Sequence, residues 1–208
     1  MAFGFGKKAP EIIEKEVIKE VYVTKEKKKA QHIGIIVGST REGRVSPQVA
    51  DYVLQIAKNH SDRTYEVIDI KAYDLPFMGT GTPNKAWNDK IAAMDGYIFV
   101  VQEYNHGLSA SLKNALDSAR EEWFNKAAGI VSYGSAGGIR AAEQVRLILA
   151  EQKVATVRTN PAFNLFTDFE NFTDFKPGPH MTAGMNDMLT ELLDWADLFA
   201  DRSQAENE

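Results

Sequence analysis

The sequence predicts an α/β fold in which a five-stranded parallel sheet carries helices on both faces. Three observations support this prediction. Five short runs of apolar, often β-branched residues have the length and composition of strands buried on both faces. Segments with apolar residues at helical spacing lie between these runs. The two kinds of segment alternate along the chain, which is typical of parallel sheets joined by crossover helices.

The strands are expected at residues 32–38, 65–70, 96–102, 128–134 and 154–159. The helices are expected where apolar side chains share one face, around residues 50–57, 89–96, 108–119, 141–149 and 185–199. Five strands and five helices suit a flavodoxin-like doubly wound domain. In such a domain a ligand binds beyond the carboxyl ends of the strands, where the strand order reverses.

Composition limits the possible functions. A chain of 208 residues with 44% hydrophobic content is expected to form one domain. The absence of cysteine excludes disulfides, thiolate nucleophiles and cysteine-bound metals. A net charge of −5 argues against nucleic-acid binding. Because the sequence contains neither a membrane-spanning apolar stretch nor a secretory leader pattern, a cytoplasmic protein is expected.

The N-terminal residues differ in charge from the rest of the chain. Residues 1–30 hold eight lysines and five glutamates, so this segment carries +3 and the remainder −8. We therefore expect a charged extension at 1–30 and a folded domain at 31–208. Ile13, Val17 and Val21 recur every four residues, but Val17, Val21 and Val23 also fit a strand. The extension is interpreted either as a solvated tail or as an arm that orders against a partner.

The turn after the first strand combines small polar residues with arginines. Gly38, Ser39, Thr40 and Arg41 follow the strand directly, and Ser46 and Pro47 are expected to open a helix, with Ser46 as the N-cap. Hydroxyls, an arginine and a helix N-terminus together favour a phosphate site. Neither a Walker A loop nor a G-x-G-x-x-G fingerprint is present, which favours a mononucleotide. The alternative is a capped helix with Arg41 and Arg44 as surface charges.

Two further turns carry groups that can line a ligand cleft. Residues 102–117 place Glu103, Tyr104, Asn105 and His106 between a buried strand and a helix, where Asn105 can read a heterocycle edge and Tyr104 offers a flat face. Residues 132–144 contain three glycines, which allow close approach of the backbone to a ligand. Taken alone, this glycine turn is also compatible with a purely structural connector.

These three motifs, GSTREGR, EYNHG with LKNALD, and YGSAGGIRAAEQ, together resemble the NAD(P)H-dependent FMN reductase family over residues 32 to 160. That family has the flavodoxin-like fold and includes quinone, azo-dye and chromate reductases. The resemblance implies an FMN phosphate held by Ser39, Arg41, Ser46, Pro47 and Gln48. It further implies an isoalloxazine ring bordered by Glu103, Tyr104 and Asn105 and, on its other side, by Gly134, Ser135 and Gly137. Gln102 is grouped with these cofactor-binding residues, although the family usually has proline there.

The resemblance implies an enzyme in which FMN carries the chemistry, so neither a catalytic side chain nor a metal is required. Electrons would pass from NADPH or NADH to quinones, azo compounds, metal oxyanions or free flavin. The family generally forms dimers or tetramers, so a homo-oligomer is expected. The alternative is a flavin-binding electron carrier or redox sensor without efficient nicotinamide turnover. Positive charge from Arg41 and Arg44 at the pocket mouth favours the enzyme.

Two other features have open interpretations. His32 and His60 are expected at the surface, whereas His106 is a candidate to touch flavin or substrate. Residues 160–181 hold five phenylalanines separated by polar residues. This long segment is interpreted as a flap over the sheet edge, or as the lining of a subunit interface or nicotinamide pocket.

Overall fold

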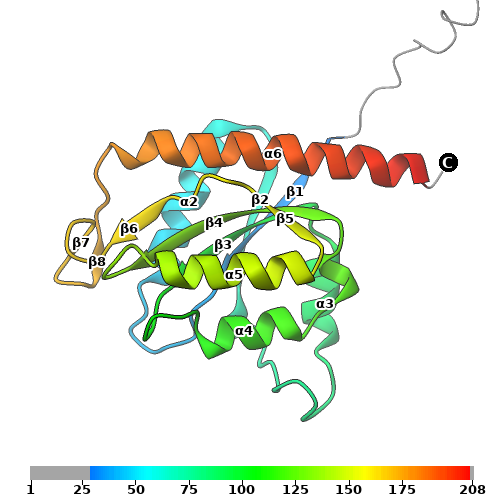
Figure 1. The fold of residues 1–208 in the computed structure, drawn as a ribbon, viewed down its shortest axis with the longest axis horizontal. Helices are drawn as coiled ribbons and strands as arrows, with labels where there is room; N and C mark the ends of the chain where they lie inside the picture. The colour runs from blue at the N-terminus through cyan, green and yellow to red at the C-terminus, as the bar shows by residue number, and fades with distance from the viewer. Residues whose placement is uncertain (1–28, 207–208) are drawn as a thin grey trace, which may run out of the picture.

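The computed structural model describes residues 29–206. Residues 1–28 lie outside the described part of the chain, and so do both interpretations of the N-terminal extension. Figure 1 shows the arrangement of the helices and strands.

The main sheet is parallel and has the strand order β2-β1-β3-β4-β5. This order confirms the flavodoxin-like prediction, and the direction of winding reverses between β1 and β3. The strands are β1 (His32–Val37), β2 (Thr64–Asp69), β3 (Gly96–Gln102), β4 (Lys126–Gly134) and β5 (Val154–Thr156).

The fifth strand position is divided between two short strands, which the sequence did not predict. β5 pairs with the first half of β4, and β6 (Ala162–Asn164) pairs with its last three residues. Between them, the backbone N–H and hydroxyl of Thr159 both donate to Glu191, at 2.9 and 2.6 Å. The predicted strand 154–159 ends at Thr156, because Arg146 takes the carbonyls of Val157 and Arg158 and Glu191 takes the Thr159 N–H.

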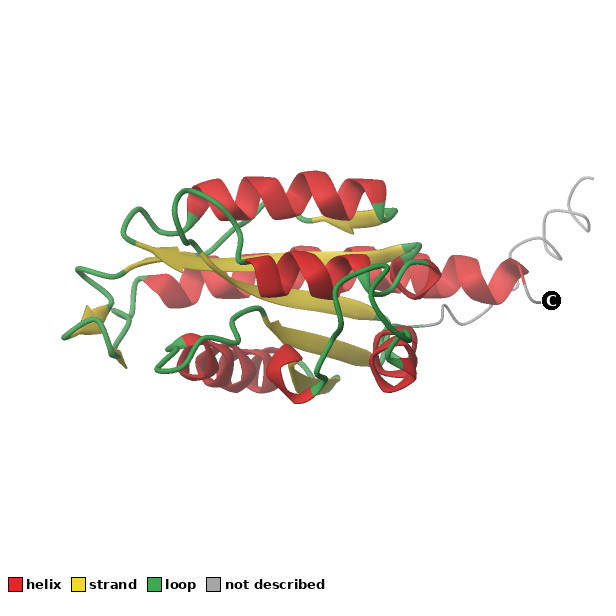
Figure 2. Cartoon of the chain, turned by 90° about the horizontal axis from the view of Figure 1, so that it is seen from below, coloured by secondary structure: helices red, strands yellow, loops and turns green. Residues whose placement is uncertain are grey.

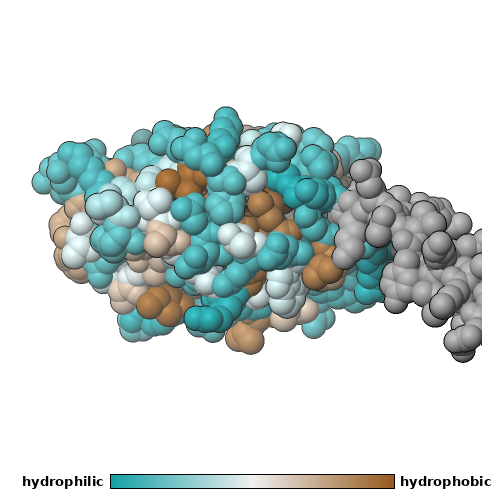
Figure 3. Space-filling view, turned by 90° about the horizontal axis from the view of Figure 1, so that it is seen from above, coloured by the Kyte–Doolittle hydropathy of each residue, from teal (hydrophilic) through white to brown (hydrophobic). Residues whose placement is uncertain are grey.

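Helices cover both faces of the sheet, as Figure 2 shows. One face packs against α2 (Ser46–His60) and α6 (Met181–Glu206), and the other against α3 (Lys85–Ala92), α4 (Ala110–Asp117) and α5 (Ile139–Glu151). Figure 3 looks onto the α6 side and shows hydrophobic residues scattered among hydrophilic ones. No helix within residues 29–206 has the length and apolar character needed to cross a membrane.

Helix α3 begins and ends earlier than the predicted 89–96. Asn84 caps it by accepting from the N–H of Trp87 at 3.1 Å, and Ala92 is its last residue. Asp95 then bonds through its own N–H to the carbonyl of His32 at 2.7 Å, which brings the chain into the sheet at Gly96. Two 3₁₀ turns, η1 (Ile70–Ala72) and η2 (Glu121–Trp123), complete the connections after β2 and before β4.

The phenylalanine-rich segment is mostly ordered against the sheet edge. Besides β6 it forms a small hairpin of β7 (Phe169–Glu170) and β8 (Asp174–Phe175). Phe163 and Phe169 are buried and Phe175 is half-buried. The flap interpretation is thus confirmed for these residues, whereas Phe166 and Phe172 remain exposed.

Candidate functional site

The turn after β1 touches the turn after β3. The Ser39 hydroxyl is buried and lies 3.0 Å from the Tyr104 hydroxyl, and the Arg41 guanidinium lies 5.9 Å from the centre of the Tyr104 ring. Ser39 also accepts from the backbone N–H of Arg41 at 3.4 Å. Arg41 is exposed and makes no ion pair with any described residue. Its cation is therefore available to an anionic ligand.

Arg44 has a different role from Arg41. Its guanidinium binds both carboxylate oxygens of Asp69, at the end of β2, and the carbonyl of Ser39. Burial opposes the charged form of Asp69, but the hydrogen bonds from Arg44 and from the Lys71 N–H outweigh it and lower the carboxyl pKa. The expectation that Arg44 brings free positive charge to the pocket mouth is wrong, because Asp69 neutralises it. Arg44 instead fixes the shape of the turn after β1.

Ser46 is the first residue of α2 and not its N-cap, which corrects the sequence prediction. Val45 holds the capping position without a side-chain hydrogen bond, and its carbonyl accepts from the N–H of Gln48 at 3.0 Å. The Ser46 hydroxyl points inward instead. It is buried beside the Tyr133 phenol, and its oxygen has no well-aligned hydrogen-bond partner among the described residues.

Pro47 and Gln48 follow in the first turn of α2. Pro47 is half-buried and has no N–H to donate. The Gln48 amide donates to the carbonyl of Thr173 at 2.8 Å and accepts from the N–H of Phe175 at 2.9 Å. Gln48 thus ties the β7–β8 hairpin to the start of α2, and this makes it a positioning residue.

Gln102 lies beneath the site rather than on its surface. Its side chain is buried, and Nε2 donates to the Gly38 carbonyl at 2.9 Å and to the Ser109 hydroxyl at 2.5 Å. Ser109 in turn caps α4 by accepting from the Leu112 N–H at 3.2 Å. The amide that replaces the family's proline therefore links the turn after β1 to the helix after β3.

The turn after β3 is narrow and presents two side chains to solvent. Tyr104 and Gly107 exchange backbone hydrogen bonds of 3.0 Å in both directions. Asn105 and His106 lie between them with φ of 49° and 65°, and both are exposed. Asparagine tolerates this left-handed conformation better than most residues, so a turn of this shape explains Asn105 at the tip.

Glu103 joins the turn after β3 to the helix after β4. Its carboxylate, only 4% exposed, accepts from Nε of Arg140 at 2.7 Å and from the backbone N–H groups of Arg140 and Ala141 at 3.1 and 3.4 Å. Burial opposes the charge, but the hydrogen bonds from Arg140 and Ala141 outweigh it and lower the Glu103 pKa. These contacts cap α5, and the position of Glu103 beside the ring stays a prediction.

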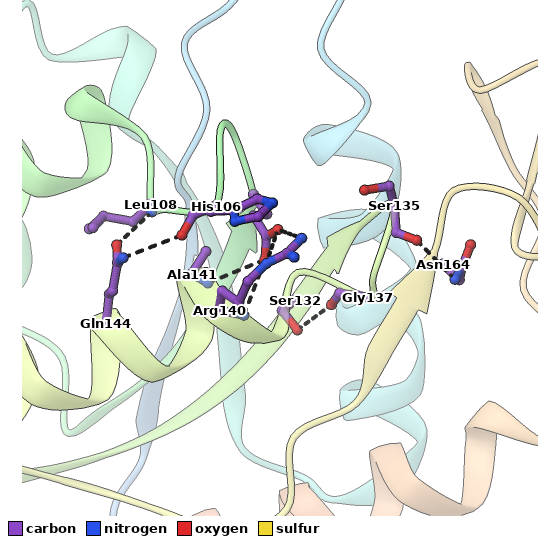
Figure 4. A network of polar contacts seen from close by, with 10 residues as sticks. His106, Leu108, Ser132, Ser135, Gly137, Arg140, Ala141, Gln144 and Asn164 are labelled. Atoms are coloured by element: carbon purple, nitrogen blue, oxygen red, sulfur yellow. Dashed lines mark hydrogen bonds and ion pairs between the residues drawn. The ribbon is translucent and has the colours of Figure 1, made fainter.

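Gln144 makes a second link between the same two elements (Figure 4). Its Oε1 accepts from the N–H of Leu108 at 3.1 Å, and its Nε2 lies 3.4 Å from the carbonyl of His106. Arg140 and Gln144 are four residues apart on α5 and therefore share one helix face. Neither was expected in the site, because their spacing in IRAAEQ indicates only that they share a helix face.

The turn after β4 requires its glycines. Gly137 and Gly138 have φ of 71° and 70°, and a Cβ on Gly138 would lie 2.6 Å from the Tyr133 carbonyl oxygen. Gly134 is buried where a Cβ would stand 3.1 Å from the Cβ of Glu103. Ser135 is exposed at the tip, and its carbonyl accepts from Asn164 of β6 at 3.2 Å (Figure 4). Asn164 is a contact that no sequence signal indicated.

Tyr133 shows that the three turns meet in space. Burial raises the pKa of its phenol. The Tyr104 phenol raises that pKa further, whereas the Ser46 hydroxyl and the Arg44 and Arg41 cations lower it. Two contacts show the convergence directly: the Ser39 and Tyr104 hydroxyls lie 3.0 Å apart, and Glu103 accepts from the N–H groups of Arg140 and Ala141 at the start of α5. The predicted convergence of the turns at one sheet edge is therefore present in the structure.

The remaining expectations concern the histidines. His32 is exposed, as expected, and His60 is partly exposed with Nδ1 3.2 Å from the Asn186 side-chain oxygen. A cavity of about 450 Å³ adjoins the turn after β1, between Thr40, residues 70–77 and the start of α4. No sequence pattern indicates this cavity, because its walls come from the turn after β1, the connection after β2 and helix α4.

The strand order and the convergent polar turns define a doubly wound nucleotide-binding type of α/β protein. The model of the NADPH-dependent FMN reductase family matches residues 32–168, and the chain belongs to this family of oxidoreductases. An NAD(P)H-dependent FMN reductase of Schizosaccharomyces pombe is 38% identical over 146 residues, which cover 64% of this chain and 73% of the relative. An NAD(P)H-dependent FMN reductase of Saccharomyces cerevisiae is 30% identical, with coverage of 60% and 76%.

A solved structure shares the fold at low sequence identity. The flavoenzyme NAD(P)H:(acceptor) oxidoreductase FerB of Paracoccus denitrificans superposes with a TM-score of 0.66 at 16% identity, covering 81% of this chain and 98% of its own. This similarity supports the architecture.

Proposed function

We propose that the chain binds FMN at the three turns and passes electrons from NADPH or NADH to quinone-type acceptors. Azo compounds, metal oxyanions and free flavin are further candidate acceptors. The observation that carries this proposal is the meeting of Ser39, Arg41 and Tyr104 at the reversal point of the sheet. Membership of the family and the names of its relatives support the cofactor and the reaction class.

The residues present fit a phosphate-bearing flavin nucleotide. Ser46 holds a buried hydroxyl oxygen without an aligned partner at the start of α2, where the helix dipole is positive. Arg41 supplies a cation that is free of ion pairs among the described residues. The left-handed glycines 137 and 138 let the backbone beside Ser135 approach a ring closely.

FMN, when bound, supplies the hydride and electron transfer, so the protein contributes binding and orientation. Arg41 and the start of α2 would compensate the phosphate charge. Tyr104 and Asn105, held by the hydrogen bonds of their turn, would border one side of the ring. The exposed backbone at Ser135 would border the other side. Glu103, Gln102 and Gln144 would hold these turns in place.

The test begins with the purified full chain. Its visible absorption shows whether FMN is bound, and titration of FMN into the apoprotein gives the dissociation constant. NADPH and NADH oxidation is then followed with a quinone acceptor. Failure to bind added FMN refutes the proposal, whereas tight binding without nicotinamide turnover supports the electron carrier or redox sensor instead.

Arg41→Ala tests the phosphate assignment. Loss of one charge-assisted contact is expected to weaken FMN binding about 10- to 100-fold. The variant should unfold at the wild-type temperature, because Arg41 is exposed. Arg120→Ala, at an exposed arginine before η2, is the matched control and should bind FMN as the wild type does. Equal FMN affinity in Arg41→Ala and Arg120→Ala would contradict the assignment.

We further propose a homo-oligomer, a dimer or tetramer, as the family resemblance implies. Light scattering of the eluting protein during gel filtration measures this directly. A mass of one chain across the working concentration range would contradict it.

A further inference from the structure

The turn that joins β7 to β8 contains an aromatic residue in an unusual backbone conformation. Asn171 and Phe172 both have positive φ, 52° and 61°, and the turn is closed by the Thr173 N–H donating to the Glu170 carbonyl at 3.1 Å. Asparagine is among the residues that enter the left-handed region readily, whereas a bulky aromatic residue there is an outlier. Glycine would meet the backbone requirement without strain.

The Phe172 ring gains little from burial in return for this strain. Its side chain is 56% exposed, and the only aromatic ring paired with it among the described residues is Phe166, which is 67% exposed. The two rings stand edge to face, with centres 5.5 Å apart and an interplanar angle of 88°. A strained residue that does not stabilise the fold is a reason to look for a function.

The segment that carries the two rings is anchored to two parts of the proposed cofactor site. Asn164 donates to the carbonyl of Ser135 and accepts from the Phe166 N–H at 2.8 Å. On the other side, Gln48 of α2 holds the hairpin backbone at Thr173 and Phe175. Figure 1 places the hairpin at the end of the molecule where α5 begins. The two exposed rings therefore stand at the rim of the site, between the turn after β4 and the start of α2.

The base of the hairpin is packed, so the rim is held in place. The ring centres of Phe169 and Phe175 lie 4.9 Å apart. The ring centre of Phe169 is 5.8 Å from that of Tyr133, and the ring centre of Phe175 is 4.8 Å from that of Phe163. Buried Asp168 accepts from the Asn164 N–H at 2.8 Å. A packed hairpin base that carries exposed rings is the arrangement expected of a preformed contact surface.

We propose that Phe166 and Phe172 form an aromatic subsite that holds the adenine end of the reduced nicotinamide dinucleotide. This inference rests on the proposed function, because the nicotinamide ring must reach the flavin between the turns. A flat ring bound by Phe166 and Phe172 would then be the second ring system of the same dinucleotide. A dinucleotide carries such a ring and a small quinone does not. An edge-to-face pair leaves ring faces open for stacking on a purine.

The closing experiment uses Phe172→Gly, which removes the ring and relieves the backbone strain together. The KM for NADPH and NADH is expected to rise about three- to tenfold, the value of one aromatic contact. The FMN dissociation constant and the KM for the quinone should stay at wild-type values. The melting temperature should rise by about 2–4 °C, because glycine suits the positive φ.

Two controls separate the ring from the backbone and from general surface effects. Asn171→Gly changes the neighbouring left-handed position but keeps both rings, and it should leave the KM unchanged. Leu147→Ser removes an exposed apolar side chain, 75% exposed on α5, and should also leave the KM unchanged.

A binding measurement tests the subsite without turnover. Adenosine monophosphate, which carries only the adenine end, is titrated into the wild type and into Phe172→Gly by calorimetry. Binding that weakens at least threefold in the variant supports the subsite even if the wild type proves inactive as a reductase, so failure of the proposed function is recognised separately.

Several outcomes overturn the inference. The first is that Phe172→Gly leaves both the KM for the dinucleotide and the binding of adenosine monophosphate unchanged. The second is that only the KM for the quinone rises. The third is that FMN affinity falls together with dinucleotide affinity. A change of oligomeric state with unchanged KM would assign the two rings to an interface between copies of the chain.

Discussion

Glu103→Gln tests how firmly the turn after β3 is attached to α5. The substitution keeps the size of the side chain but removes its charge and replaces one acceptor oxygen by a donor. In the wild type that carboxylate faces only donors, the guanidinium of Arg140 and the N–H groups of Arg140 and Ala141. The amide NH₂ of the variant must therefore face an N–H group.

The expected loss of stability follows from these contacts. A hydrogen bond to a charged group contributes about 1.5–3 kcal/mol. The Arg140 side chain is 41% exposed, so solvent screens its share and the lower part of that range applies. We expect Glu103→Gln to lower the free energy of unfolding by about 2 kcal/mol, equivalent to about 4–8 °C in melting temperature.

The pH dependence gives an independent check. Because the Glu103 pKa is lower in the folded chain than its ordinary value of 4.5, the unfolded chain binds more protons in the acid range. The stabilisation is then complete well above pH 4.5 and is lost as the pH falls through the folded pKa. The difference between wild type and variant should be largest near pH 7 and should shrink below about pH 4.5.

Urea unfolding followed by circular dichroism at several pH values measures both effects. FMN affinity should fall as well, because Glu103 holds two turns of the site together. Equal stability of the two proteins at pH 7, or a difference that does not change with pH, would refute this account of the Glu103 contacts.

Three further predictions concern other parts of the structure. Gly138→Ala should lower the free energy of unfolding by at least about 3 kcal/mol, because the new Cβ would lie 2.6 Å from backbone at a residue with positive φ. Gly43 also has positive φ, but a Cβ there meets nothing within 4 Å, so Gly43→Ala should lower that free energy by only about 1 kcal/mol. Thermal unfolding measures both. Arg44→Ala should destabilise by about 2 kcal/mol, since Asp69 loses its partner, and a denaturation curve equal to wild type would contradict this. Burial lowers the Lys126 pKa from 10.5 to about 8, so stability should gain from this group as the pH rises from 8 to 10.5. Lys126→Met should lack that gain when the two unfolding curves are compared.

Many features of the site could be predicted because they depend on local sequence and on the handedness of crossovers. Alternating strands and helices fix a parallel sheet, and in such a sheet all carboxyl ends share one edge. The turns at Ser39, Tyr104 and Ser135 had to meet there once the strand order placed β1, β3 and β4 side by side.

The errors concern side chains whose partners are far away in the sequence. The strand predicted to reach Thr159 stops at Thr156, because Arg146 of α5 takes the next two carbonyls and Glu191, 32 residues beyond Thr159, takes the Thr159 N–H. Gln48, expected at the phosphate, is occupied by a hairpin 125 residues away. Ser46 lost the capping role because its hydroxyl turned inward toward Tyr133. None of these partners leaves a periodic or spacing signal.

The sequence by itself determined the doubly wound fold, the edge of the sheet where a ligand binds and the motifs that resemble a flavin reductase. Only the tertiary structure decided which polar groups are free to meet a ligand. Arg41 and Arg44 are three residues apart and chemically identical, yet Asp69 neutralises one and leaves the other available. Pairing of this kind depends on distances across the fold, and no local pattern in the sequence reveals those distances.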